Sequence, residues 1–67
     1  MQPNLLRAKI VENQLSQKEV AKALGLSENT MTKRLSGKTA FNTDEVIKLC
    51  DLLNIVDDVE KSRIFLS

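Results

Sequence analysis

The stretch that decides the fold is Gln17–Leu35, QKEVAKALGLSENTMTKRL. Just ahead of it, Ser16 is followed three residues later by Glu19, a spacing typical of the reciprocal capping box that starts a helix. Gly25 stands where this helix must end, because glycine readily takes the left-handed conformation of a helix stop. Ser27 can cap a second helix almost at once. We therefore expect two short helices joined by a tight turn.

Apolar side chains recur on one face of each of these two helices. Val20, Ala21 and Leu24 share a face of the first helix, and Met31 and Leu35 lie one turn apart on the second. Because a tight turn makes the helices cross steeply, the residues at the crossing must be small or apolar, as these are. The pair therefore predicts a helix-turn-helix. The opposite face of the second helix carries the polar residues Asn29, Thr30 and Lys33.

Capping signals predict three further helices around this pair. Pro3 pre-sets the backbone of a first helix and Asn4 can cap it. Asn42 and Glu45 repeat the capping-box spacing for a fourth helix, and Asp57 marks a last short one. We expect an all-α protein, a compact bundle of four to five short helices in one domain over residues 1–67. The expected helices span residues 4–13, 17–24, 28–35, 43–53 and 58–65.

Length and composition limit the classes of function. A chain of 67 residues buries only about 60% of the surface that its unfolded form exposes, so we expect no deep catalytic cleft. It has no histidine and one cysteine, Cys50, which we place on an apolar helix face as a buried small hydrophobe. We therefore expect no enzyme, no metal or other cofactor, and no small-molecule substrate. There is no secretory signal and no apolar run near the roughly 18 residues that span a bilayer, so the expected location is cytoplasmic, with no membrane partner.

The net charge of +1 conceals an asymmetry along the chain. Residues 1–40 carry seven Lys or Arg against three Glu, a net +4, whereas residues 41–67 carry three basic and six acidic side chains, a net −3. The basic part contains the two-helix motif, so a polyanion is attracted to one part of the molecule and repelled by the other. The total charge is nonetheless low for a nucleic-acid-binding protein.

Four residues of the motif carry a resemblance to a known family. Gln17, Ala21, Gly25 and Met31 form the pattern Q-x3-A-x3-G-x5-M, which resembles the Cro/repressor class of phage helix-turn-helix proteins, the lambda-repressor-like domains. The resemblance covers nearly the whole chain. The segment Leu35–Glu45, LSGKTAFNTDE, and the closing IFL look most like small regulators or antirepressors of temperate phages of Gram-positive bacteria. The expected cytoplasm is then that of the bacterial host cell.

The resemblance implies that residues 28–35 lie in the major groove of double-stranded operator DNA. The residues that would contact bases are Glu28, Asn29, Thr30 and Lys33. Those that would contact phosphates are Ser16, Gln17, Lys38 and Thr39. Side-chain chemistry agrees for three of the base contacts, because an asparagine amide pairs with adenine, a lysine donates to guanine and a threonine methyl touches thymine. The carboxylate of Glu28 can accept from cytosine but is repelled by phosphates.

Two positions depart from the family pattern. An arginine near the end of the first helix often pairs with a glutamate near the end of the recognition helix, and the corresponding residues here are Ile10 and Leu35. An apolar pair can replace an ion pair without loss of stability. Arg34 stands where the family usually carries an apolar residue, and we expect it to reach either toward phosphate or toward the acidic part of the chain.

Two functions from different classes follow from these features. The first is a Cro-like phage transcription regulator that binds operator DNA through its third helix in a lysis–lysogeny switch. The second is an antirepressor or modulator that binds the opposing phage repressor protein and alters its DNA binding. The low net charge and Glu28 favour the second function.

The apolar tail admits two interpretations. The residues concerned are Ile64, Phe65 and Leu66. They either close the core of the domain or form an exposed protein interface, for the cognate repressor or for a second copy of this chain in a homodimer.

Overall fold

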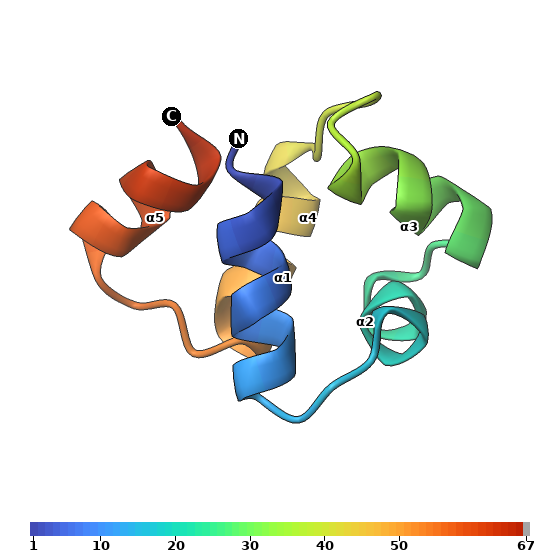
Figure 1. The fold of residues 1–67 in the computed structure, drawn as a ribbon, viewed down its shortest axis with the longest axis horizontal. Helices are drawn as coiled ribbons and strands as arrows, with labels where there is room; N and C mark the ends of the chain where they lie inside the picture. The colour runs from blue at the N-terminus through green and yellow to red at the C-terminus, as the bar shows by residue number, and fades with distance from the viewer. Residues whose placement is uncertain (67) are drawn as a thin grey trace.

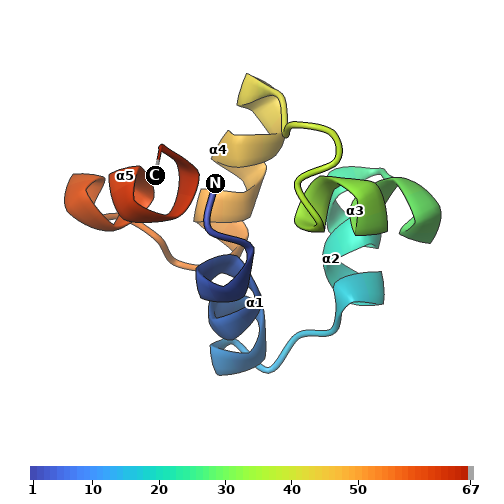
Figure 2. The ribbon, with the colours of Figure 1, turned by 45° about the horizontal axis from the view of Figure 1, so that its top comes forward.

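Five helices make up most of residues 1–66, the part of the chain that the computed structural model describes. They are α1 (Pro3–Glu12), α2 (Gln17–Leu24), α3 (Glu28–Leu35), α4 (Thr43–Leu52) and α5 (Asp58–Phe65). The α2–α3 pair and α5 lie at opposite ends of the molecule, with α1 and α4 between them (Figures 1 and 2). The two ends of the chain meet, because the amide of Gln2 donates to the carbonyl of Ile64 at 2.7 Å. The prediction of an all-α fold is confirmed.

The predicted signals at both ends of α2 are confirmed. The hydroxyl of Ser16 accepts from the amide of Glu19 at 3.1 Å, and the Glu19 carboxylate accepts from the amide of Ser16 at 3.0 Å. At the other end Gly25 has a φ of +74°, which is the left-handed conformation of a helix stop. Ser27 then caps α3, because its hydroxyl accepts from the amide of Thr30 at 3.1 Å. These local hydrogen bonds fix the turn between the two helices.

The ends of α4 and the start of α5 also follow from capping residues. Asn42 and Glu45 form a second reciprocal capping box, as the spacing predicted. The helix ends at Leu52, one residue earlier than expected, and Asn54 follows with a φ of +57°, in the left-handed region that asparagine tolerates. Asp57 caps α5 by accepting from the amide of the second helical residue at 2.9 Å.

The prediction that Asn4 caps α1 is wrong. The helix begins one residue earlier, at Pro3, and the preceding residue, Gln2, makes no side-chain capping bond. Proline explains the difference, because its fixed φ already suits the first helical position and it has no N–H that needs a cap. The helix ends at Glu12, and Gln14 takes a φ of +60° at the break.

All five helices contribute to a single core. The crossing of α2 and α3 is filled by the apolar residues that the sequence assigned to it, and Cys50 is buried as predicted. The buried apolar residues are Leu6, Ile10, Val20, Ala21, Leu24, Met31, Leu35, Leu49, Cys50, Leu53, Ile55 and Ile64.

An ion pair fastens α5 to α1. The ammonium group of Lys9 lies 2.8 Å from a carboxylate oxygen of Glu60 and 3.4 Å from one of Glu12. The bond to Glu60 is the main cause that raises the pKa of Lys9 above its ordinary value, against a smaller opposing effect of burial. The packing of α5 against α1 thus gives Lys9 a partner that lies far away in the sequence.

Candidate nucleic-acid interface

The outer face of α3 is polar and exposed because the helix turns its apolar residues toward the core. Met31 and Leu35 are buried, whereas Glu28, Asn29 and Lys33 are exposed. The side chains of Asn29 and Lys33 lie four residues apart, hence on one face, and neither bonds to another group among residues 1–66. We call the residues Glu28, Asn29, Thr30 and Lys33 the α3 face. It offers one carboxylate, one amide, one hydroxyl and one ammonium group.

Thr30 differs from the other three residues of the α3 face. It is half-buried, and its hydroxyl accepts from the hydroxyl of Ser27 at 2.9 Å. The backbone amide of Thr30 donates to the same hydroxyl of Ser27 at 3.1 Å. The methyl group of Thr30 is therefore held in one place at the start of the helix, and its hydroxyl keeps one donor to offer to another molecule.

A side-chain hydrogen bond ties the start of α2 to the middle of α3. The amide group of Gln17 donates to the hydroxyl of Thr32 at 2.8 Å, and this hydroxyl donates in turn to the carbonyl of Glu28 at 2.9 Å. Gln17 therefore lies beside α3, although 15 residues separate it from Thr32. Ser16, at the N-cap of α2, uses its hydroxyl within the capping box. Of the two predicted phosphate-contacting residues at the start of α2, Gln17 thus contacts α3, whereas Ser16 bonds within α2.

The loop after α3 carries the other two predicted phosphate-contacting residues. The amides of Lys38 and Thr39 both donate to the carbonyl of Lys33, at 3.0 and 3.2 Å. Gly37 has a φ of +82°, a conformation that glycine adopts at no steric cost, and it turns the chain back over the end of the helix. Lys38 and Thr39 are therefore exposed at the C-terminal end of α3, with their backbone fixed.

Arg34 points toward the acidic part of the chain, the second of the two directions that the sequence allowed. Its guanidinium pairs with Glu45 of α4, with 3.0 Å between Nε and Oε1 and 3.4 Å between Nη2 and Oε2. The third nitrogen, Nη1, donates to the hydroxyl of Thr39 at 3.0 Å. The sequence indicated Glu45 only as a capping residue, so this long-range partner was missed. One signal in the sequence could have revealed it. Arg34 lies three residues after Met31, near the buried side of α3, where a charged group needs a partner.

The environment of Glu45 favours its charged form. Burial of Glu45, which is 6% exposed, acts to raise the pKa of its carboxyl, but the backbone amide of Asn42 and the guanidinium of Arg34 outweigh burial and lower that pKa. Ile10 and Leu35 are both buried apolar residues, so no ion pair joins α1 to α3 at that place. The ion pair that α3 does make, between Arg34 and Glu45, joins it to α4.

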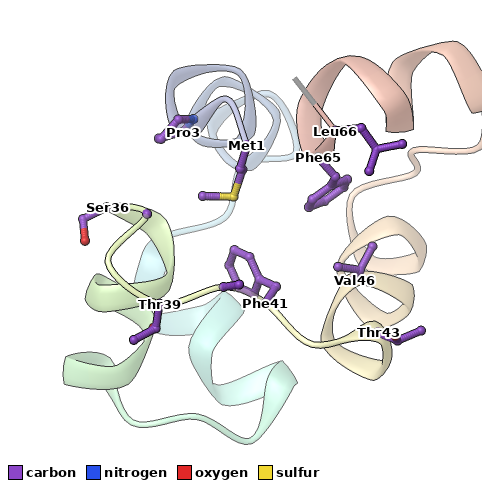
Figure 3. Close-up of a pocket in the computed structure, with 11 residues that line it drawn as sticks. Met1, Pro3, Ser36, Thr39, Phe41, Thr43, Val46, Phe65 and Leu66 are labelled. Carbon is purple, nitrogen blue, oxygen red and sulfur yellow. The ribbon is translucent and has the colours of Figure 1, made fainter.

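The tail residues separate into core and surface. Ile64 is 2% exposed and belongs to the core, which is the first of the two interpretations of the tail, because α5 turns this residue toward α1. Phe65 is half-buried and packs against the core, and Leu66 is 82% exposed. Phe65 lines an open groove of about 610 Å³ together with the start of the chain and the loop after α3. Figure 3 shows Met1, Phe41 and Phe65 pointing into this groove.

Two classes of site are not found in the described part of the chain. None of the five helices is long and apolar enough to cross a membrane. Residues 1–66 bring together no group of three or more His, Cys, Asp or Glu side chains that could hold a metal ion.

Fold and surface together define a small all-α domain with five short helices and an exposed polar face on the third. The chain belongs to DUF739, a family described as proteins of unknown function, which it matches over residues 4–66. No curated protein and no solved structure matches the chain. The resemblance to lambda-repressor-like domains therefore stays a prediction, and the function has to be argued from the surface itself.

Proposed function

We propose that this protein is a Cro-like phage transcription regulator that binds operator DNA through α3 in a lysis–lysogeny switch. In this proposal α2, the turn at Gly25 and α3 form a helix-turn-helix, and α3 lies in the major groove. The observation that carries the proposal is the α3 face, where Asn29 and Lys33 extend side by side from a helix whose opposite side is anchored in the core.

The groups on the α3 face match the chemistry of base edges. An asparagine amide both donates and accepts, so Asn29 can make two bonds to adenine, and the ammonium of Lys33 can donate to the acceptors of guanine. The methyl of Thr30 can contact that of thymine. Glu28, at the first position of α3, can accept from cytosine.

Phosphate contacts in this proposal come from both sides of the α3 face. Gln17 is the first residue of α2, where unpaired backbone amides and the helix dipole favour an anion. Lys38 and Thr39 lie at the other end of α3. Two flanking sets of contacts would set the position of α3 along the groove, while the bases are read between them. The net charge of +4 over residues 1–40 favours approach to DNA from this side.

The proposal is tested by selecting binding sites for the full chain from a library of random DNA duplexes and measuring affinity for the selected site. We expect Asn29→Ala to weaken binding by about 1–3 kcal/mol and to relax the preference for adenine at one position. Lys33→Ala should weaken binding by a similar amount and relax the preference for guanine. Lys48→Ala on α4, which removes the same charge from the acidic part of the chain, is the matched control.

Two results would contradict the proposal. One is that the chain selects no sequence from the library at low salt. The other is that Asn29→Ala and Lys33→Ala bind the selected site as tightly as Lys48→Ala does over a salt titration, which would remove the α3 face from recognition.

A second candidate function is an antirepressor that binds the opposing phage repressor protein. The observation that favours it is the open groove of about 610 Å³, whose apolar lining includes Phe41, Phe65 and the exposed Leu66, none of which is assigned to a DNA contact. Gel filtration of this protein with the repressor encoded beside its gene discriminates between the two functions. A shared peak at micromolar concentration, lost in Phe41→Ser, would support the antirepressor, and two separate peaks would count against it.

A further inference from the structure

We infer that Arg34 and Glu45 form a clamp that holds the loop of residues 36–42 in the position from which Lys38 and Thr39 contact DNA. The inference rests on the proposed function, since it assigns Arg34 as a positioning residue for that interface. Arg34 then acts on DNA through the loop and makes no contact with DNA itself.

The clamp joins three parts of the chain at one guanidinium. Arg34 comes from the last turn of α3, and its two contacts with Glu45 reach α4. Its remaining contact, 3.0 Å from Nη1 to the hydroxyl of Thr39, reaches the middle of the loop. Each of the three nitrogens of the guanidinium therefore has a partner inside the protein.

The same carboxylate also holds the far end of the loop. Oε1 of Glu45 accepts from Nε of Arg34 at 3.0 Å and from the amide of Asn42 at 2.9 Å. The loop leaves α3 after Leu35 and enters α4 at Thr43. The buried carboxylate of Glu45, on α4, therefore bonds both to α3 and to the last residue of the loop. Loss of the Arg34 pair weakens the side-chain link between the loop and α3 and leaves only backbone bonds to Lys33 there, whereas the bond from Asn42 to Glu45 still holds the loop to α4.

The clamp differs from a simple source of positive charge. The Arg34 side chain is 21% exposed, and its charge is compensated by that of Glu45 at bonding distance. A mere attraction between Arg34 and DNA would grow if Glu45 were neutralised, because a negative charge near the phosphates would disappear. A clamp would instead fail under the same change. The two roles therefore predict opposite effects of one substitution.

Glu45→Gln is the substitution that separates them. Its amide oxygen, in the place of Oε1, can still accept from the amide of Asn42, so the capping box survives. Its NH₂ group, in the place of Oε2, cannot accept from Nη2 of Arg34, and the negative charge that attracts the guanidinium is gone. Glu19→Gln is the matched control, because it changes the net charge by the same amount and Glu19 has the same role in the capping box of α2. Among residues 1–66, Glu19 pairs with no arginine.

The first measurement is affinity for the selected DNA site as a function of salt. We expect Glu45→Gln to weaken binding about tenfold and to lower the steepness of the salt dependence by about one ion, because a released Lys38 loses its phosphate contact. Glu19→Gln should bind as tightly as the wild type or more tightly. Binding by Glu45→Gln that matches or exceeds that of Glu19→Gln would overturn the inference.

The second measurement needs no DNA. The amides of Lys38 and Thr39 donate to the carbonyl of Lys33, and we expect both to exchange with solvent at least about fivefold faster in Glu45→Gln. The amide of Leu26, which closes the turn after α2 by donating to Ala21 at 2.9 Å, should keep its rate. Unchanged exchange at the two loop amides would overturn the clamp even if the wild type binds DNA.

A second, conservative variant tests the clamp in case Glu45→Gln does not fold. Arg34→Lys keeps the positive charge but has a single ammonium in place of the three-nitrogen fork, so it cannot hold Glu45 and Thr39 together. We expect it to accelerate the same two amides and to reduce the salt dependence as Glu45→Gln does. Failure of the wild type to select DNA would contradict the proposed function, whereas amide exchange decides the clamp separately.

Discussion

At the scale of single residues, Glu45 makes the stability of the domain depend on pH. Its folded-state pKa lies below its ordinary value of 4.5 because the Asn42 amide and Arg34 outweigh burial. A carboxyl with a lowered folded-state pKa adds stability that is fully present above pH 4.5 and is lost as pH falls through the folded-state pKa. The relevant range therefore lies on the acid side of pH 4.5.

We expect Glu45→Gln to lower the free energy of unfolding at pH 7 by about 1–3 kcal/mol, because the half-buried guanidinium of Arg34 loses its charged acceptor. The same variant should lose less stability than the wild type between pH 6 and pH 3, since it has no carboxylate to protonate at this position. Urea unfolding at the two pH values measures both effects. Parallel pH profiles for the two proteins would mean that Glu45 does not stabilise the fold through its charge.

Cys50 gives a second prediction at this scale. The residue is 6% exposed, and burial raises the pKa of its thiol above the ordinary value of 9.0, although Lys61 acts in the opposite direction. Because the thiolate is the reactive form, the native protein should react with an aromatic disulfide reagent at least about 100-fold more slowly than the protein unfolded in urea. Equal rates at neutral pH would show that the core around Cys50 opens readily.

At the scale of elements, the stop between α2 and α3 depends on backbone conformation and not on space. Gly25 has a φ of +74°, and a Cβ atom built there would meet no atom within 4 Å. We therefore expect Gly25→Ala to destabilise the fold by about 1–2 kcal/mol through left-handed strain alone. Gly25→Asn should cost less, because asparagine tolerates this conformation, as Asn54 does in the native chain at φ +57°.

Thermal unfolding of Gly25→Ala, Gly25→Asn and the wild type at one pH measures this ranking. Equal stability of the two variants would mean that the turn adjusts its backbone. In that case the angle between α2 and α3 is not fixed by Gly25.

The helix boundaries could be predicted because their signals are local. Ser16 with Glu19, and Asn42 with Glu45, each bring donor and acceptor together within one turn, so the spacing in the sequence is enough. Asn4 is the exception: its side chain could cap a helix, but α1 begins at the proline before it, so Asn4 lies inside the helix. Boundaries therefore follow from the sequence when a single local interaction dominates.

The candidate site was predictable in part for the same reason. The exposure of Asn29 and Lys33 follows from the burial of Met31 and Leu35 on the other side of one helix. The partners of Gln17 and Arg34 could not be predicted, because Gln17 meets a residue 15 positions away and Arg34 one 11 positions away. These contacts are set by how the helices pack against each other, which no local pattern in the sequence encodes.

At the scale of the whole molecule, one core carries all five helices, so no helix is independent of the others. A domain of 67 residues has a free energy of unfolding of about 3–10 kcal/mol. The α2–α3 pair lies at one end of the molecule and α5 at the other, with shared core residues between them (Figure 1). The position of the α3 face thus depends on contacts at the far end, where the chain termini meet.

The tail provides the sharpest test of this dependence. Ile64 is 2% exposed and its carbonyl accepts from the amide of Gln2 at 2.7 Å, whereas Leu66, two residues later, is 82% exposed. We expect Ile64→Ala to lower the free energy of unfolding by about 2–5 kcal/mol, enough to unfold a large share of the molecules, because it leaves a cavity in the core. Leu66→Ala should change it by less than about 0.5 kcal/mol.

Urea unfolding of both variants at several protein concentrations separates a core residue from an interface residue. A core residue such as Ile64 should show the same loss at every concentration, since the contacts that it makes lie within one chain. A loss in Leu66→Ala that appears only at high concentration would mean that a second copy covers this side chain, because association stabilises the folded state by mass action. A large loss in Leu66→Ala at every concentration would contradict the exposed position of Leu66 in the fold.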